Sequence, residues 1–109
     1  MSWTTLDNIQ QLEALNLASA EVPQLIFKHS TRCGTSGMVK NRLFKKELPS
    51  GIDFYYLDLI ANREISNKIS EIYRVRHESP QVLLIKEGKC TYNESHSAIY
   101  MDDIEAEAM

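Results

Sequence analysis

Residues 25–37 read LIFKHSTRCGTSG, an apolar run that leads through a polar segment into a helical pattern. The triplet at residues 25–27 is too short for a helix and is typical of a central strand buried on both faces. Beyond Cys33, Val39 and Leu43 recur at helical spacing, so a helix is expected to begin at the cysteine. Unpaired N–H groups at a helix start carry partial positive charge and favour the reactive thiolate. Cys33 is therefore the candidate nucleophile, the alternative being an inert apolar cysteine.

The chain around Cys33 predicts a single-cysteine chemistry. Ser36 stands three residues later, so a C-x-x-C dithiol cannot form. Two interpretations of Ser36 stay open: its hydroxyl bonds the thiolate, or it satisfies an early helix amide. Arg32 either adds positive potential beside the sulfur or is an ordinary solvated loop residue. Cys90 is expected to be structural, and a resolving role at Cys33 is the alternative.

Four helices are predicted from capping residues and apolar spacing. The first covers about Thr5 to Ala18, with a capping box at Thr4 and Asp7, and the second runs from Cys33 to a break at residues 49–51. The third follows the cap Asn62 and buries Ile65, Ile69 and Ile72. The fourth follows the cap Ser95 and carries Ala98, Met101 and Ile104.

The expected strands are residues 25–27, 54–57, 82–85 and 90–92. A right-handed crossover makes the first two parallel, and a turn at residues 87–89 makes the last two an antiparallel hairpin. The order α-β-α-β-α-β-β-α is the thioredoxin-like arrangement, an α/β fold with a four-stranded mixed sheet flanked by helices. We expect residues 1–109 to form a single domain.

Composition excludes several classes of function. The chain has 109 residues, 43% of them hydrophobic, which is enough for one core without metal or disulfide support. Its formal charge of -3 argues against a nucleic-acid partner, and its longest aliphatic run, residues 82–85, is too short for a membrane span. Two cysteines and three histidines form no zinc-ligand spacing, so no metal is expected. Free thiols fit a reducing, cytoplasmic location.

A second informative feature is Ser79-Pro80, immediately before the strand at residues 82–85. A cis peptide bond here would turn the backbone of Ser79 toward Cys33, where it can pair with an extended substrate. A trans proline that only starts the strand is the alternative. His29 and His77 lie near the ends of elements that converge on the sulfur, and each is either a base or a local hydrogen-bonding group.

Three segments carry a resemblance to a known family. The residues HSTRC at 29–33 with Ser36, and RHESPQ at 76–81 before a Val-Leu-Leu-Ile strand, closely resemble the YtxJ family of monothiol bacilliredoxin-like proteins. Gly34 stands where many members have proline. The resemblance implies a thioredoxin-like fold and removal of bacillithiol, a low-molecular-weight thiol, from S-thiolated cytosolic proteins.

Carried onto this chain, the resemblance makes Cys33 the attacking cysteine and Ser36 the replacement of a resolving one. The expected substrate-binding residues are Arg32, Gly34, Thr35, Ser36, Ser79 and Pro80. No bound cofactor is expected; the small thiol is a co-substrate, and S-thiolated proteins are the partners.

Two other functions remain possible on the sequence. The loop at residues 33–36 is similar to the C-G-F-S loop of monothiol glutaredoxins, which carry a shared iron–sulfur cluster. Thr35 replaces the aromatic residue of that motif. A redox-silent stress or scaffold protein of the same fold is the third possibility.

Overall fold

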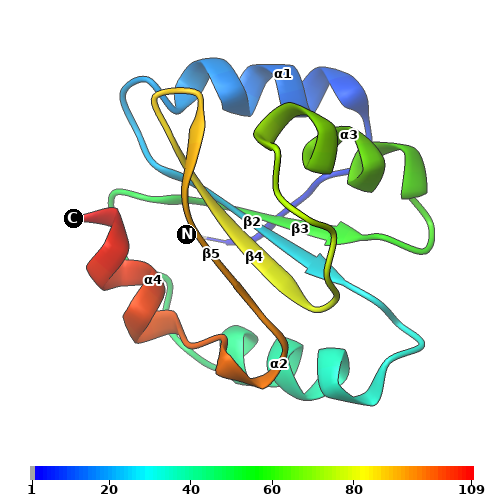
Figure 1. Cartoon of the computed structure of the whole chain (residues 1–109). Helices are drawn as coiled ribbons and strands as arrows, with labels where there is room; N and C mark the ends of the chain where they lie inside the picture. The colour runs from blue at the N-terminus through cyan, green and yellow to red at the C-terminus, as the bar shows by residue number, and fades with distance from the viewer. Residues whose placement is uncertain (1) are drawn as a thin grey trace.

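The structure, a computed structural model, describes residues 2–109 and contains a five-stranded sheet with helices on both faces (Figure 1). The strands are β1 (Thr4–Thr5), β2 (Gln24–His29), β3 (Asp53–Asp58), β4 (Gln81–Lys86) and β5 (Lys89–Ser95). The helices are α1 (Ile9–Ala18), α2 (Gly34–Phe44), α3 (Arg63–Tyr73), the 3-10 turn η1 (His96–Ala98) and α4 (Met101–Ala108).

The sheet is mixed, in the order β1-β3-β2-β4-β5. Strands β1, β3 and β2 are parallel, and β4 is antiparallel to both β2 and β5. The expected mixed α/β architecture is thus confirmed, but the sheet has five strands where four were predicted. The additional strand is β1, in which Thr4 and Thr5 pair with Tyr55 and Tyr56 at the sheet edge.

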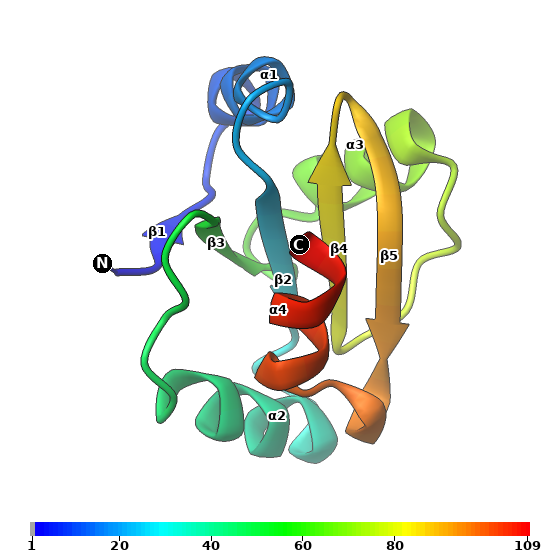
Figure 2. The same cartoon turned by 90° about the vertical axis from the view of Figure 1, so that its left-hand side faces the viewer.

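Two apolar cores lie on opposite faces of the sheet, under different helix pairs (Figures 1 and 2). Leu25 and Phe27 of β2 pack toward α2 and α4, whereas Ile26 packs toward α1 and α3. This alternation follows from the two-residue period of a strand. Every residue of β2 is buried, as predicted for a central strand covered on both sides.

The first helix begins later than predicted. Asn8 is its N-cap: the Asn8 side chain accepts from the Gln11 amide at 2.9 Å, and Gln11 Oε1 accepts from the Asn8 amide at 3.1 Å. The capping box is therefore Asn8 with Gln11, and the prediction of Thr4 with Asp7 was wrong. Sheet pairing keeps Thr4 and Thr5 extended, so α1 cannot reach back to residue 5.

Three further local predictions need correction. On α3, Ile65 and Ile69 are buried, but Ile72 is 44% exposed, and Tyr73 takes the inward position. Asn62 is the N-cap by position, yet its side chain donates to the Asp58 carbonyl at 3.3 Å instead of capping the helix. The hairpin turn is the pair at residues 87–88, because Lys89 already pairs with Lys86.

The last helix is also divided. After β5 the chain forms η1, and α4 starts at Met101 with Tyr100 as its N-cap. Ser95 precedes η1 and makes no side-chain capping bond there, so the predicted cap was wrong. Arg42 of α2 donates to the carbonyls of Ser97 and Ile99 at 2.9 and 2.8 Å, which holds this segment against α2.

Candidate functional site

Cys33 occupies the N-cap position of α2, as the sequence predicted. Its backbone is extended, with φ -110° and ψ 122°, and its side chain is partly exposed. Its amide donates to the Ser30 carbonyl at 3.2 Å, and its own carbonyl accepts from the Gly37 amide at 3.0 Å, the first hydrogen bond of the helix. Arg32, Gly34 and Thr35 on either side are exposed. The first backbone amides of α2, which have no hydrogen-bond partners within the helix, therefore follow directly after a residue with an accessible sulfur.

Ser36 holds this loop from inside the protein. Its side chain is fully buried, and its hydroxyl accepts from the Ser30 amide at 2.9 Å and lies 2.7 Å from Nδ1 of His29. The Ser36 hydroxyl therefore makes neither of the two hydrogen bonds considered for it, to the Cys33 thiolate or to an early helix amide. Full burial also leaves no surface for a substrate to touch, so Ser36 shapes the loop and its expected direct substrate contact is corrected to an indirect one.

His29 has a local role. It is 4% exposed, and its ring packs beside Phe27 and Tyr56. Burial, with the nearby positive charge of Lys40, lowers the pKa of His29 below its ordinary value, so the neutral ring that bonds Ser36 is favoured at physiological pH.

The peptide bond between Ser79 and Pro80 is cis, the first of the two possibilities left open by the sequence. Lys28 pairs with Gln81 across the β2–β4 ladder, so the loop that leaves β2 and the loop that enters β4 lie at the same end of the sheet (Figure 1). The Pro80 carbonyl accepts from the His96 amide at 2.9 Å. Within residues 2–109, the buried Ser79 hydroxyl has no hydrogen-bond partner. Cys33 and Ser79 are thus carried by adjacent loops.

Sequence reasoning missed Lys28. This residue of β2 is fully buried, and its Nζ lies 2.7 Å from His77 Nδ1 and 3.1 Å from Gln81 Oε1. Burial lowers the pKa of Lys28 to about 8, although the negative charge of Glu78 acts in the opposite direction. The available signal was a lysine inside a strand predicted to be buried on both faces, since a fully buried lysine needs polar partners.

Cys90 lies at the other end of the sheet. It pairs with Ile85 in the β4–β5 ladder, whereas the strand end near Cys33 is at Gln81. Four residues of strand span about 14 Å, well beyond the roughly 7 Å that separates the Cα atoms of a disulfide at most. The Cys90 thiol donates to the Tyr92 carbonyl at 3.3 Å, and burial raises its pKa. The alternative of a resolving Cys90 therefore fails, and the residue is structural.

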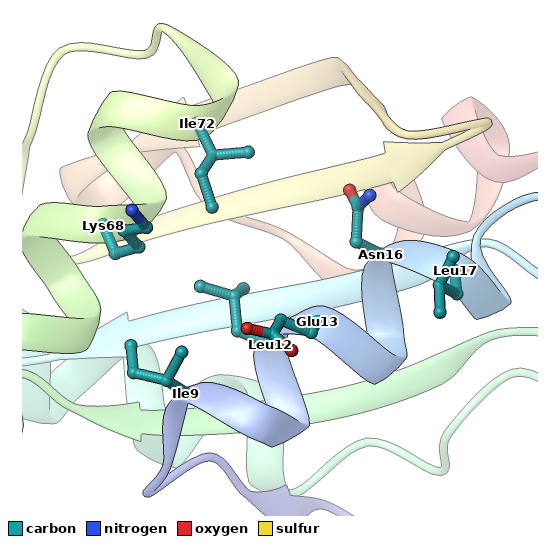
Figure 3. A pocket seen from close by; sticks show the side chains of 7 residues that line it. All are labelled: Ile9, Leu12, Glu13, Asn16, Leu17, Lys68 and Ile72. Atoms are coloured by element: carbon teal, nitrogen blue, oxygen red, sulfur yellow. The ribbon is translucent and has the colours of Figure 1, made fainter.

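An apolar pocket lies elsewhere, between α1 and α3 (Figure 3). It has a volume of about 310 Å³, with Leu12 at its base and the exposed side chains of Leu17 and Ile72 at its sides. None of the predicted site residues lines it. Among residues 2–109, no helix has the length and apolar character needed to cross a membrane. Over the same range no three His, Cys, Asp or Glu side chains group as metal ligands.

Several solved structures of proteins with the thioredoxin fold share this architecture. A protein described provisionally as an oxidoreductase with a thioredoxin fold aligns with a TM-score of 0.84 at 25% identity, over 97% of this chain and 93% of the other. Thioredoxin (Mala s 13) of Malassezia sympodialis aligns at 0.75 with 15% identity, over 96% and 86%. Mitochondrial thioredoxin 3 of Saccharomyces cerevisiae aligns at 0.74 with 18% identity, over 97% and 92%. The thioredoxin-like fold is confirmed.

Family membership follows from the sequence match. Residues 4–104 match the family described as monothiol bacilliredoxin BrxC, a span that includes the Cys33 loop, the Ser79–Pro80 bond and every strand of the sheet. Together with the fold, this match assigns the protein to the thiol oxidoreductases. The chain belongs to the monothiol bacilliredoxin BrxC family.

Proposed function

We propose that the protein uses Cys33 to remove a low-molecular-weight thiol, with bacillithiol as the leading candidate, from S-thiolated proteins of the cytoplasm. The observation that carries this proposal is the partly exposed Cys33 at the start of α2, beside the loop that bears the cis Ser79–Pro80 bond. Membership of the monothiol bacilliredoxin family supports it.

The reaction is thiol–disulfide exchange. The Cys33 thiolate attacks the small-thiol sulfur of the mixed disulfide, the old S–S bond breaks, and the client protein leaves as a thiolate that takes a proton from water. Cys33 then carries the small thiol as a new mixed disulfide. A second small thiol, acting as thiolate, attacks the small-thiol sulfur of that adduct. The Cys33 thiolate leaves, and the two small thiols depart as their oxidised dimer. No bound cofactor takes part, and the reductant is the second thiol.

The surrounding residues have distinct roles in this proposal. Arg32, Gly34 and Thr35 are exposed next to the sulfur and offer contacts for the small thiol. The backbone of Ser79 pairs with an extended client segment, as an added strand would. Pro80 is buried and Ser36 is fully buried, so both act by shaping the two loops.

Intact mass spectrometry tests the proposal directly. The reduced protein is incubated with oxidised bacillithiol, oxidised glutathione or oxidised coenzyme A, and one adduct per chain on Cys33 is expected, most rapidly with bacillithiol. Cys33→Ser should give no adduct and no release of thiol from an S-bacillithiolated client. Cys90→Ser is the matched control and should react like the wild-type protein, because that thiol is half-buried at the far end of the sheet.

Two results would count against the proposal. Client reduction that persists in Cys33→Ser would remove the assigned nucleophile. A visible-region absorbance band after anaerobic reconstitution with iron and sulfide, lost in Cys33→Ser, would favour the iron–sulfur carrier if the adduct also fails to form.

A further inference from the structure

The buried amine of Lys28 is an unusual feature of the central strand. The side chain has no exposed surface, and its two hydrogen-bond partners, Nδ1 of His77 and Oε1 of Gln81, are uncharged acceptors. A buried ammonium group loses its hydration and is retained only where the surrounding groups compensate. A methionine or leucine would fill the same space without that penalty, so the amine indicates a need for its hydrogen bonds.

Those hydrogen bonds act on one loop. Oε1 of Gln81 also accepts from the Glu78 amide at 3.4 Å, and Nε2 of Gln81 donates to the Arg76 carbonyl at 3.0 Å. Lys28 bonds to His77, which lies between Arg76 and Glu78 in the chain. One amine and one amide side chain therefore hold residues 76–78, the segment directly before the cis bond. On its other side the loop is held by Glu78, whose carboxylate lies 3.2 Å from Nε2 of His96.

Neighbouring residues of β2 thus hold two different loops. Lys28 holds residues 76–78 on the face covered by α3, and His29 holds Ser36 of the Cys33 loop on the face covered by α2. Because the two residues are adjacent in one fully buried strand, any shift of β2 moves both loops together. The distance between a client segment paired at Ser79 and the sulfur of Cys33 depends on this arrangement.

We propose that Lys28 is a positioning residue that, with His77 and Gln81, holds the loop at residues 76–80 in register with the Cys33 loop, so that client proteins are aligned for exchange. The inference rests on the proposed function. It predicts that loss of the Lys28–His77 bond slows reaction with a protein disulfide and leaves the intrinsic reactivity of the Cys33 sulfur unchanged.

His77 makes this device sensitive to pH. Nδ1 of His77 accepts a hydrogen bond from the Lys28 ammonium only while Nδ1 itself carries no proton. The groups around the ring are Lys28 of β2, Arg63 and Ser66 of α3, and Glu78 of the same loop, and Gln81 of β4 bonds the same Lys28 amine. Burial and the two cations lower the pKa of His77, and Glu78 opposes them. Protonation of His77 below neutral pH removes the acceptor, and the positively charged ring then repels the Lys28 ammonium.

The experiment compares four variants with the wild-type protein. Lys28→Met removes the donor, His77→Phe removes the acceptor, and His77→Asn keeps an acceptor close to Nδ1 without its titration. Lys89→Met is the matched control, since Lys89 is exposed on β5 at the hairpin end of the sheet. Each protein is assayed for reduction of an S-bacillithiolated client protein, for alkylation of Cys33 by iodoacetamide, and for hydrogen exchange of the Glu78 amide, which donates to Gln81 Oε1.

We expect Lys28→Met and His77→Phe to lower kcat/KM for the client about tenfold, mainly through KM, with alkylation within twofold of wild type. Exchange of the Glu78 amide should accelerate by about tenfold or more. His77→Asn should retain the client rate and lose only the part of the acid-side decline that exceeds the decline in Cys33 alkylation, because protonation of the Cys33 thiolate slows both proteins alike. Lys89→Met should match wild type in all three measurements.

Other outcomes overturn the inference. Unchanged client rates and unchanged amide exchange in folded Lys28→Met and His77→Phe would show that the loop does not depend on this bond. Equal loss of client reduction and alkylation would show an effect on the sulfur itself. If wild-type protein reduces no S-thiolated client while loop exchange responds as expected, the proposed function fails and the structural role of Lys28 stands alone.

Discussion

Lys28 should make the stability of this protein rise with pH in the weakly alkaline range. Its pKa is about 8 in the folded protein and 10.5 when the side chain is unperturbed, so between these values the unfolded chain binds the additional proton. The contribution of Lys28 to the free energy of unfolding is therefore smaller below pH 8 than above pH 10.5. A shift of this size corresponds to about 3 kcal/mol across the whole window. Because the side chain has no exposed surface, solvent screening reduces that value only in part.

The accessible part of the window is smaller. Between about pH 7.5 and about pH 9.5, the same two pKa values give an increase of about 2 kcal/mol in the free energy of unfolding. Lys28→Met has no amine to titrate and should lack this increase. Cys90 titrates in the same range and, because burial raises its pKa, acts in the opposite direction. That contribution is present in both proteins and cancels in the comparison.

Urea unfolding followed by tryptophan fluorescence gives the measurement. Trp3 is the only tryptophan, and it packs against Phe27, Phe44 and Phe54, so its emission reports the loss of the core. Wild type and Lys28→Met are unfolded at a series of pH values under reducing conditions, with Lys89→Met as the control for loss of an exposed lysine. The control should follow wild type. If the curves for wild type and Lys28→Met stay parallel from pH 7.5 to 9.5, the assignment of a desolvated amine to Lys28 is refuted.

Three further substitutions test separate parts of the structure. Ser36→Ala leaves the buried Ser30 amide and the His29 ring without their partner, and should lower stability by about 1–3 kcal/mol and speed protease cleavage in the Cys33 loop. Gly88→Ala places a side chain at φ 75°; its Cβ would meet only Nδ2 of Asn16, at an ordinary contact distance of 3.9 Å, so the expected loss of about 1 kcal/mol reflects backbone strain and shows in a thermal melt. Asn8→Ala removes the cap of α1 and should lower the urea midpoint by an amount equal to about 1 kcal/mol, whereas no change would show that the box is dispensable.

The correct predictions for the fold came from local signals that nothing in the tertiary structure opposed. The apolar triplet at residues 25–27 became the centre of β2, and the helix began at Cys33, because period and polarity agreed there. The predicted antiparallel hairpin of β4 and β5 also formed, although its turn is Glu87–Gly88 alone, with both residues at positive φ as in a tight two-residue turn.

The incorrect predictions arose where two local signals competed. Thr4 with Asp7 and Asn8 with Gln11 are both plausible helix starts, and pairing of Thr4 and Thr5 with β3 selected the second. On α3, spacing alone could not show whether residue 72 or residue 73 faces the sheet. The choice of Tyr73 is stabilised by its hydroxyl, which donates to Asn16 of α1 at 2.7 Å.

The sequence by itself determined the class of fold, the candidate nucleophile Cys33 and the absence of a second cysteine at residue 36, since these depend on spacing along the chain. Only the tertiary structure decided that Ser36 is bonded to His29, that Cys90 lies at the far end of the sheet, and that Lys28 is joined to His77 across 49 residues of chain. Sequence spacing carries no information about which residues of distant loops meet at a sheet end. That meeting is set by strand register and by the requirement that buried polar groups find partners.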